Sequence, residues 1–271
     1  MVQMLIGEGC SMKYENIIYE VKESIGFLTV NRPDKLNALN AKVIDEIVHA
    51  LGEVKKSEEV KVLIVTGSGS KAFVAGADIP EIQAIGLKDG MDFSRRGQEM
   101  TRNVEELGKP SIAAVNGLAL GGGCELALGC TFRILSETAK LGLPELALGA
   151  LPGYGGTQRM SRMIGKSRTL WMILTGEMLS AQEAYQMGVA NKVVKPEELM
   201  DVAAATAKKI AQKPALAMKM CIMAVNHGSE TDLESGLFIE SALANIVLGS
   251  QDKAEGIAAF IEKRKPVFTG K

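Results

Sequence analysis

Glycine is gathered at three places in the first part of the chain, and this clustering is the strongest constraint on what the sequence can form. The segments are 67–76, 117–129 and 149–156, and each follows or precedes an apolar run. Glycine permits positive φ angles and lets backbone come close to a ligand. One such loop would be an ordinary turn. Three in so short a stretch predict that backbone amides form a binding surface.

The first half of the chain alternates patterns typical of strands and helices. Residues 15–30 form two runs rich in β-branched residues with a short turn between them, which predicts a hairpin. Residues 41–56 carry apolar side chains at helical spacing. Apolar runs at 62–66 and 111–115 predict buried strands, with a polar helix at 91–107 between them. This alternation predicts an α/β domain with a buried sheet.

After about residue 195 glycine becomes sparse and the pattern changes to consecutive helices. The sequence therefore predicts a core domain at 12–195 and a helical domain at 196–271, with residues 1–11 as an extension ahead of Met12. Such a helical domain serves either assembly or the covering of the core. The predicted helices span 196–212, 214–226, 232–248 and 252–263, and Ser180 with Glu183 fits a capping box for an earlier one.

The charge balance excludes two classes of protein. Lys and Arg number 31 against 32 Asp and Glu, which gives a formal net charge of −1. This excludes a broadly basic nucleic-acid-binding protein and an acidic disordered tail. Aromatic residues make up only 4%, so platforms for stacking bases are not expected either. We expect no nucleic-acid partner.

The cysteines are scattered through the sequence. Cys10, Cys124, Cys130 and Cys221 form no C-x-x-C pair and no close set with the two histidines, so no zinc site and no other metal site is expected. Free thiols of this kind are typical of a reducing compartment. No apolar stretch approaches the length of a membrane span, and the start of the chain lacks the pattern of a signal peptide. We expect a cytoplasmic protein without membrane association.

Two nucleotide-binding motifs were tested and rejected. Gly165-Lys166-Ser167 resembles the end of a phosphate-binding loop, but Met160 stands where that motif needs glycine. The segment 67–72 loosely fits a dinucleotide-binding pattern. That pattern requires a helix to begin there, and the glycine at position 76 would weaken one.

Glu125 lies in the second glycine-rich segment, just after a predicted strand. Gly121-Gly122-Gly123 precedes it, and a helix of small residues is expected to open at about Gly123. The first turn of a helix offers free N–H groups and the positive end of its dipole, which can stabilise an oxyanion. Glu125 is either a catalytic group or an ordinary acidic stabiliser of the helix start.

Glu145 is the second candidate. It lies in an apolar stretch bounded by proline and glycine, and burial there would raise its pKa. The alternative is an exposed glutamate in a surface loop. Two carboxylates flanked by glycine amides suit one chemistry well. The amides hold a carbonyl oxygen that becomes an enolate, and the carboxylates move protons and water.

Four segments in this order resemble the enoyl-CoA hydratase/isomerase (crotonase) superfamily, from about Lys13 to the end of the chain. They are residues 31–39, 71–79, 121–127 and 143–159. The resemblance implies a spiral core of ββα units with a C-terminal helical domain, assembled as a homotrimer or a homohexamer. It also implies an acyl-CoA thioester as substrate, with no separate cofactor.

The resemblance also implies roles for individual residues. The backbone N–H groups of Ala77 and Gly122 match the oxyanion hole of the family, and Glu125 and Glu145 match its two acids. The remaining implied contacts are with coenzyme A, through the backbone around Ala75, Gly76, Asp78 and Ile79 and through the phosphate-facing Lys35 and Lys265.

Because both glutamates are present, the resemblance implies reversible hydration of a trans-2-enoyl-CoA to a 3-hydroxyacyl-CoA. Glu125 would act as the base toward water and Glu145 would supply the proton at Cα. Two alternatives stay open within the superfamily: an enoyl-CoA isomerase, and a hydratase for an unusual CoA ester. A third, from another class, is a non-catalytic relative that binds coenzyme A or RNA. The sequence does not determine the length of the acyl chain.

Overall fold

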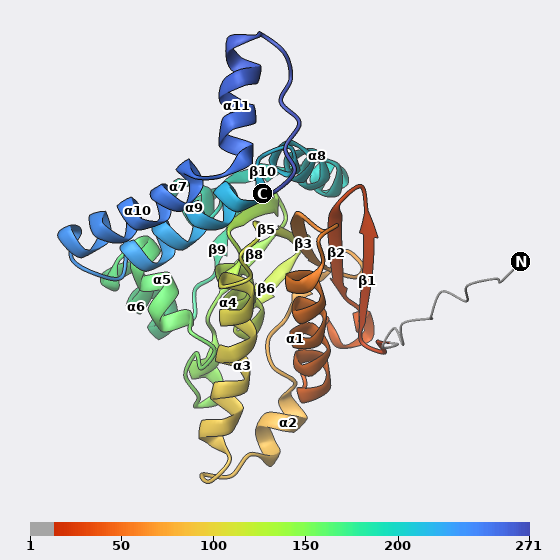
Figure 1. Ribbon diagram of the computed structural model, residues 1–271. Helices are drawn as coiled ribbons and strands as arrows, with labels where there is room; N and C mark the ends of the chain where they lie inside the picture. Colours follow the sequence, from red (N-terminus) through yellow and green to blue (C-terminus); the bar gives the residue numbers. More distant parts are fainter. Residues whose placement is uncertain (1–13) are drawn as a thin grey trace, which may run out of the picture.

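The computed structural model describes residues 14–271 and contains a six-stranded sheet (Figure 1). Its strand order is β1-β2-β3-β5-β7-β10. The first pair is antiparallel, whereas every later neighbour is parallel. The strands are β1 (Ile17–Lys22), β2 (Ile25–Val30), β3 (Val62–Gly67), β5 (Ser111–Val115), β7 (Phe132–Ser136) and β10 (Lys192–Val194).

A second sheet of four strands has the order β4-β6-β8-β9. Successive turns of the chain give one strand to each sheet and then helical structure, as in β3, β4, α2 and α3, or β5, β6 and α4. This is the predicted ββα spiral, and the predicted α/β class is confirmed. The bounds are β4 (Ala72–Val74), β6 (Leu118–Leu120), β8 (Lys140–Gly142), β9 (Leu179–Ser180), α2 (Ile79–Ala84), α3 (Gly90–Glu105) and α4 (Gly122–Gly129).

The predicted elements agree closely with those observed. The hairpin forms β1 and β2, and the helix expected at 41–56 is α1 (Ala41–Lys56). Asn40 caps α1 by accepting a hydrogen bond from the Val43 N–H, at 2.9 Å, which explains where the helix begins. The capping box of Ser180 and Glu183 is present at α7 (Ala181–Gln186).

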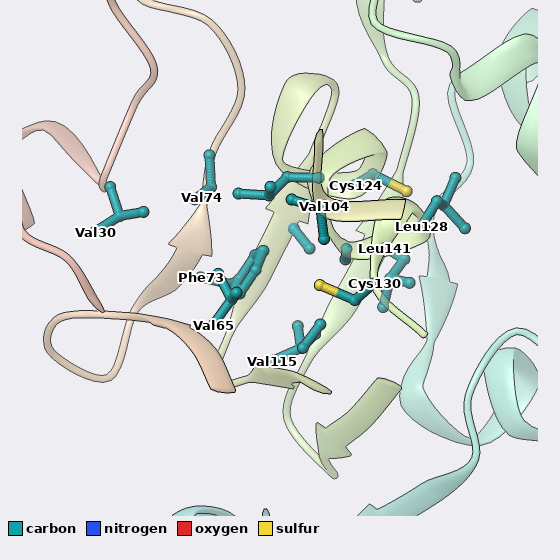
Figure 2. Packing of buried hydrophobic residues seen from close by; sticks show 14 of the residues in the cluster. Val30, Val65, Phe73, Val74, Val104, Val115, Cys124, Leu128, Cys130 and Leu141 are labelled. Carbon is teal, nitrogen blue, oxygen red and sulfur yellow. The ribbon is translucent and has the colours of Figure 1, made fainter. Parts of the chain in front are cut away.

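The main core lies between the sheets and the helices α1, α3 and α4. Figure 2 shows part of it, where Phe73 of β4 lies beside Val65 of β3. Cys124 and Cys130 are buried in this core as free thiols, whereas Cys221 is exposed. Burial raises the pKa of the Cys124 thiol, which keeps it protonated and unreactive.

The opposite face of the six-stranded sheet is covered by α8 (Leu199–Ala211). Leu199, Ala203 and Ala207 are buried there against apolar side chains of β2, β3, β5 and β7. A short 3₁₀ turn at Pro196–Glu198 leads into this helix. The domain boundary at 195/196 stays a prediction, and α8, which follows it, packs on the sheet.

The last three helices extend away from the sheets (Figure 1). They are α9 (Ala215–Gly228), α10 (Leu233–Leu248) and α11 (Gln251–Ile261), and α10 packs against α9. Many of their large apolar side chains are exposed. These are Val225, Leu233, Leu237, Phe238, Ile246, Leu248, Ile257, Phe260 and Ile261.

Across residues 14–271, no helix combines the length and the apolar character that crossing a membrane requires. The expected extension at 1–11 and Cys10 lie outside the described residues.

Candidate active site

A cavity of about 410 Å³ opens between the second sheet, α3, α4 and the loop that follows β8. Its wall is mostly apolar. Glu125, Glu145, Ala77 and Gly122 all line it. Gly122 and Glu125 belong to the second glycine-rich segment, Ala77 directly follows the first, and Glu145 lies shortly before the third. The rest of the wall includes Ala75, Gly76, Ile79, Ile82, Ile85, Phe93, Leu120, Leu148, Leu151 and Tyr154.

The Glu125 carboxylate is fixed by backbone. It lies in the first turn of α4 and is 1% exposed. Its Oε1 accepts hydrogen bonds from the N–H groups of Tyr154, at 2.8 Å, and Gly156, at 2.7 Å. Burial raises the pKa of Glu125 to about 7, and the nearby Glu145 also raises it, against the lowering effect of the two backbone N–H groups. The group can therefore exchange a proton near neutral pH.

Two glycines allow this packing. A methyl group added at Gly156 would lie 3.0 Å from Oε1 of Glu125, within the space that the carboxylate occupies. One added at Gly123 would lie 1.9 Å from the Val74 carbonyl oxygen, so α4 touches β4 through bare backbone. The helix carrying Glu125 can lie where it does only because its first turn has no side chains on that face.

Glu145 is held differently. It begins a 3₁₀ turn, η2 (Glu145–Leu148), whose other residues are exposed. Its Oε2 is buried and has no hydrogen-bond partner among residues 14–271. Burial raises the pKa of Glu145, which favours the protonated acid. Gly121, at φ +49°, brings bare backbone to this carboxyl, since a methyl group there would lie 2.8 Å from Oε1.

The backbone at Ala77 is held by the pairing of its neighbours with Leu39. The Leu39 N–H donates to Gly76 O and the Asp78 N–H donates to Leu39 O, both at 2.8 Å, which makes a short parallel bridge between Leu39 and Ala77. Successive amides along an extended chain point to opposite sides. The Ala77 N–H therefore points away from Leu39, and Ala77 itself lines the cavity.

Gly122 supplies a second amide. It is the first residue of α4, so its N–H has no acceptor within the helix. The preceding Gly121 donates its own N–H to Gly142 O, at 2.9 Å, which ties the helix start to β8. The positive end of the α4 dipole lies at the same point.

The other predicted site residues divide into two groups. Ala75, Gly76 and Ile79 line the cavity. Asp78, Lys35 and Lys265 are not among its lining residues. The Asp78 carboxylate instead pairs with Arg32, and the two lysines are exposed. Their predicted contacts with coenzyme A stay predictions.

Sequence reasoning missed Tyr154. Its backbone N–H holds Glu125, its ring packs where a methyl group on Gly97 would lie, and its buried hydroxyl has no partner among the described residues. The available signal was a single large side chain between Gly153 and Gly155. With Tyr154 included, the cavity offers the backbone amides of Ala77 and Gly122, two carboxyls of raised pKa and an apolar wall. This set can hold a polarised carbonyl group and move protons beside it.

The spiral of ββα turns around this cavity defines a protein of the crotonase fold. An enoyl-CoA hydratase from Bacillus anthracis has a solved structure that superposes with a TM-score of 0.91 at 37% identity, covering 95% of this chain and all of that one. A family model described as enoyl-CoA hydratase/isomerase matches residues 20–271. The chain belongs to the enoyl-CoA hydratase/isomerase family.

Two similar relatives have specific names. A crotonyl-CoA hydratase from Syntrophomonas wolfei is 44% identical over 260 residues, which cover 96% of this chain and 100% of the relative. A short-chain-enoyl-CoA hydratase from Clostridium acetobutylicum is 42% identical over 254 residues, covering 94% of this chain and 97% of the relative.

Proposed function

We propose that the protein is an enoyl-CoA hydratase, which reversibly adds water to a trans-2-enoyl-CoA to form a 3-hydroxyacyl-CoA. The observation that carries this proposal is one cavity lined by Glu125, Glu145 and the two amide-bearing residues Ala77 and Gly122. The names of the two relatives support the same reaction, with a short acyl chain.

The two amides would form the oxyanion hole. The thioester carbonyl oxygen accepts from the N–H groups of Ala77 and Gly122, and this polarises the conjugated double bond toward attack at Cβ. As the bond to water forms, negative charge moves to the oxygen, where fixed donors stabilise it without reorganisation.

The carboxyls would then divide the proton transfers. Oε1 of Glu125 is held by backbone, whereas no residue from 14 to 271 bonds Oε2, which can take a proton from water as the water oxygen bonds to Cβ. Protonated Glu145 donates its proton to Cα, where the electron pair of the broken π bond completes a C–H bond. Water is thus added across the double bond, and solvent restores the two protonation states.

The direct test is incubation of the purified protein with crotonyl-CoA, followed by loss of the enoyl-thioester absorbance and detection of 3-hydroxybutyryl-CoA. A series of enoyl-CoAs of increasing length should give the highest kcat/KM for short chains. Double-bond migration without hydration would instead identify an isomerase. Binding of RNA with no turnover of any CoA ester would identify the non-catalytic class.

Assembly belongs to the same proposal. The exposed apolar side chains of α9–α11 support association of these helices with other copies, as a homotrimer or a homohexamer, and residues 196–271 would be the assembly domain. Phe238→Glu combined with Phe260→Glu should lower the mass measured by light scattering. Leu87→Glu, at a fully exposed leucine on the α2–α3 loop, is the matched control and should not.

Three finer points complete the proposal. Lys35 and Lys265 would meet the phosphates of coenzyme A, and Asp78 would lie along the same path. The reaction as written needs no metal and no redox cofactor. The protein would act in the cytoplasm on thioesters of fatty acid metabolism.

A further inference from the structure

The segment just before α1, residues 36–39, is hydrogen-bonded to the loop that carries Ala77, residues 75–78. Besides the two bonds between Leu39 and its neighbours, the Ala75 N–H donates to Leu36 O at 3.0 Å. The two segments therefore run side by side over residues 36–39 and 75–78. The direction of the Ala77 N–H depends on this pairing, because a shift of one residue would turn it away from the cavity.

Arg32 joins both sides of the pairing. Its Nη2 donates to Oδ2 of Asp78 at 2.9 Å, and its Nη1 donates to the Ala38 carbonyl oxygen at 2.6 Å. The side chains of the ion pair are only 16% and 14% exposed, so solvent screens their attraction less than at the surface. One guanidinium thus holds the residue after Ala77 and the residue before Leu39.

Asp78 pairs with Arg32 and does not make the capping hydrogen bond that is usual at its position. It is the N-cap residue of α2, where an aspartate normally accepts a hydrogen bond from the first turn of its helix. No such bond is present at Asp78. The carboxylate points to Arg32 instead, which indicates that tertiary structure determines its orientation.

The backbone from Arg32 to Asn37 is also fixed. Leu36 and Asn37 have φ angles of +50° and +59°, a conformation that few side chains favour. The buried Asn37 side chain supports it by accepting from the Arg32 N–H at 3.0 Å and donating to Ala72 O at 2.9 Å. Arg32 therefore extends from an anchored backbone.

We propose that Arg32 is a positioning residue for the hydration reaction. Through Asp78 and Ala38 it keeps the Ala77 N–H directed at the thioester oxygen. This inference rests on the proposed function, since it assigns a purpose to one donor of the proposed oxyanion hole. It gives Asp78 a part in that positioning besides any contact with coenzyme A.

The kinetic test uses Arg32→Gln, Asp78→Asn and the double variant. Each should lower kcat for crotonyl-CoA about tenfold with KM within about twofold, which is less than the 10²–10³-fold cost of losing a donor outright. Because both act through one contact, the double variant should cost no more than either single one. Glu23→Gln, which breaks the exposed pair of Glu23 with Lys208, is the control and should retain full activity.

A spectroscopic test separates positioning from simple loss of structure. An aryl enoyl-CoA absorbs at longer wavelength when its carbonyl is polarised, so the wild-type protein should shift its absorption on binding. The variants should bind it equally but shift it less. An undiminished shift, or effects of the two single changes that add in the double variant, would overturn the proposal. If Arg32→Gln does not fold, Arg32→Lys takes its place, because lysine keeps the charge but cannot contact both Asp78 and the Ala38 carbonyl oxygen as the guanidinium does. The same absorption and kinetic measurements apply to it.

The two proposals fail differently. If the wild-type protein shifts the absorption of the aryl thioester but hydrates no enoyl-CoA, the proposed function is contradicted. The absorption spectra of the variants still decide the role of Arg32 in that case. A wild-type hydratase whose variants keep kcat contradicts the role of Arg32 alone.

Discussion

The two walls of the cavity present a carboxyl each, yet they are built in opposite ways. On the α4 wall every residue from Gly122 to Gly129 is buried, and Glu125 accepts two backbone hydrogen bonds. On the η2 wall the residues after Glu145 are exposed, and one buried oxygen of that carboxyl is unpartnered among the described residues.

This difference shows how one cavity can contain a fixed group and an adjustable one. Glu125 is immobilised before any substrate arrives by two backbone N–H groups, which lower its pKa, while its burial raises it. Glu145 has an unpaired oxygen in an outer turn, so a substrate can supply its missing partner. A reaction that must place water accurately and then deliver a proton to a neighbouring carbon has use for both.

The largest expected effect is on the rate. Glu125→Gln and Glu145→Gln should each lower kcat for crotonyl-CoA hydration by roughly 10²–10⁴-fold, because each removes a group that transfers a proton. Steady-state kinetics on folded, assembled protein would measure this. Full activity in either variant would show that the glutamate it replaces does not take part in catalysis.

Gly123→Ala should damage the α4 wall next most severely. The added methyl would lie 1.9 Å from the Val74 carbonyl oxygen, so helix and strand must separate, at about 1–3 kcal/mol or more for overpacking. Thermal unfolding would reveal the loss. Gly52→Ala is the matched control, because that helical glycine has nothing within 4 Å and should gain stability. Equal behaviour of the two variants would contradict the tight contact.

The same wall should be more stable without its charge. Burial raises the pKa of Glu125 from 4.5 to about 7 in the folded protein. The contribution of the protonated Glu125 side chain to the free energy of unfolding is therefore complete below about pH 4.5 and is lost as the pH rises through 7. Glu125→Gln should therefore unfold with a free energy about 3 kcal/mol higher than wild type at pH 8. Denaturant titrations at pH 5 and 8 would compare them. A variant that is less stable than wild type at both pH values would show that burial of the Glu125 charge does not destabilise the fold.

The smallest expected effect concerns the pH dependence. Glu125 must be ionised to accept a proton, so kcat/KM should fall about tenfold per unit as pH decreases below about 7. Because the proposed form of Glu145 is the neutral acid, Glu145→Gln should keep this limb at the same pH in its residual activity. A limb that moves to lower pH would mean that Glu145 is ionised in the wild type, since its charge raises the pKa of Glu125.

Much of the fold could be predicted because its signals are local. Apolar runs predict β3 and β5, helical spacing predicts α1, and the glycines predict where backbone lines the cavity. The donors to Glu125 could not be predicted, since the Tyr154 and Gly156 amides reach it only after the chain has folded back. The contact of Arg32 with Asp78 has the same origin, since it joins residues 46 positions apart. Nor does any local pattern reveal that α8 packs on the sheet.

The spiral itself has a consequence for how the protein acquires activity. The cavity takes its wall from successive turns, with Ala77 in an early one, Gly122 in the next and Glu145 and Tyr154 later still. Contacts between such distant parts of a chain form slowly during folding. Helical content should therefore return before turnover when denatured protein is diluted into buffer, and a nascent chain would stay inert until its synthesis had passed the last of these turns.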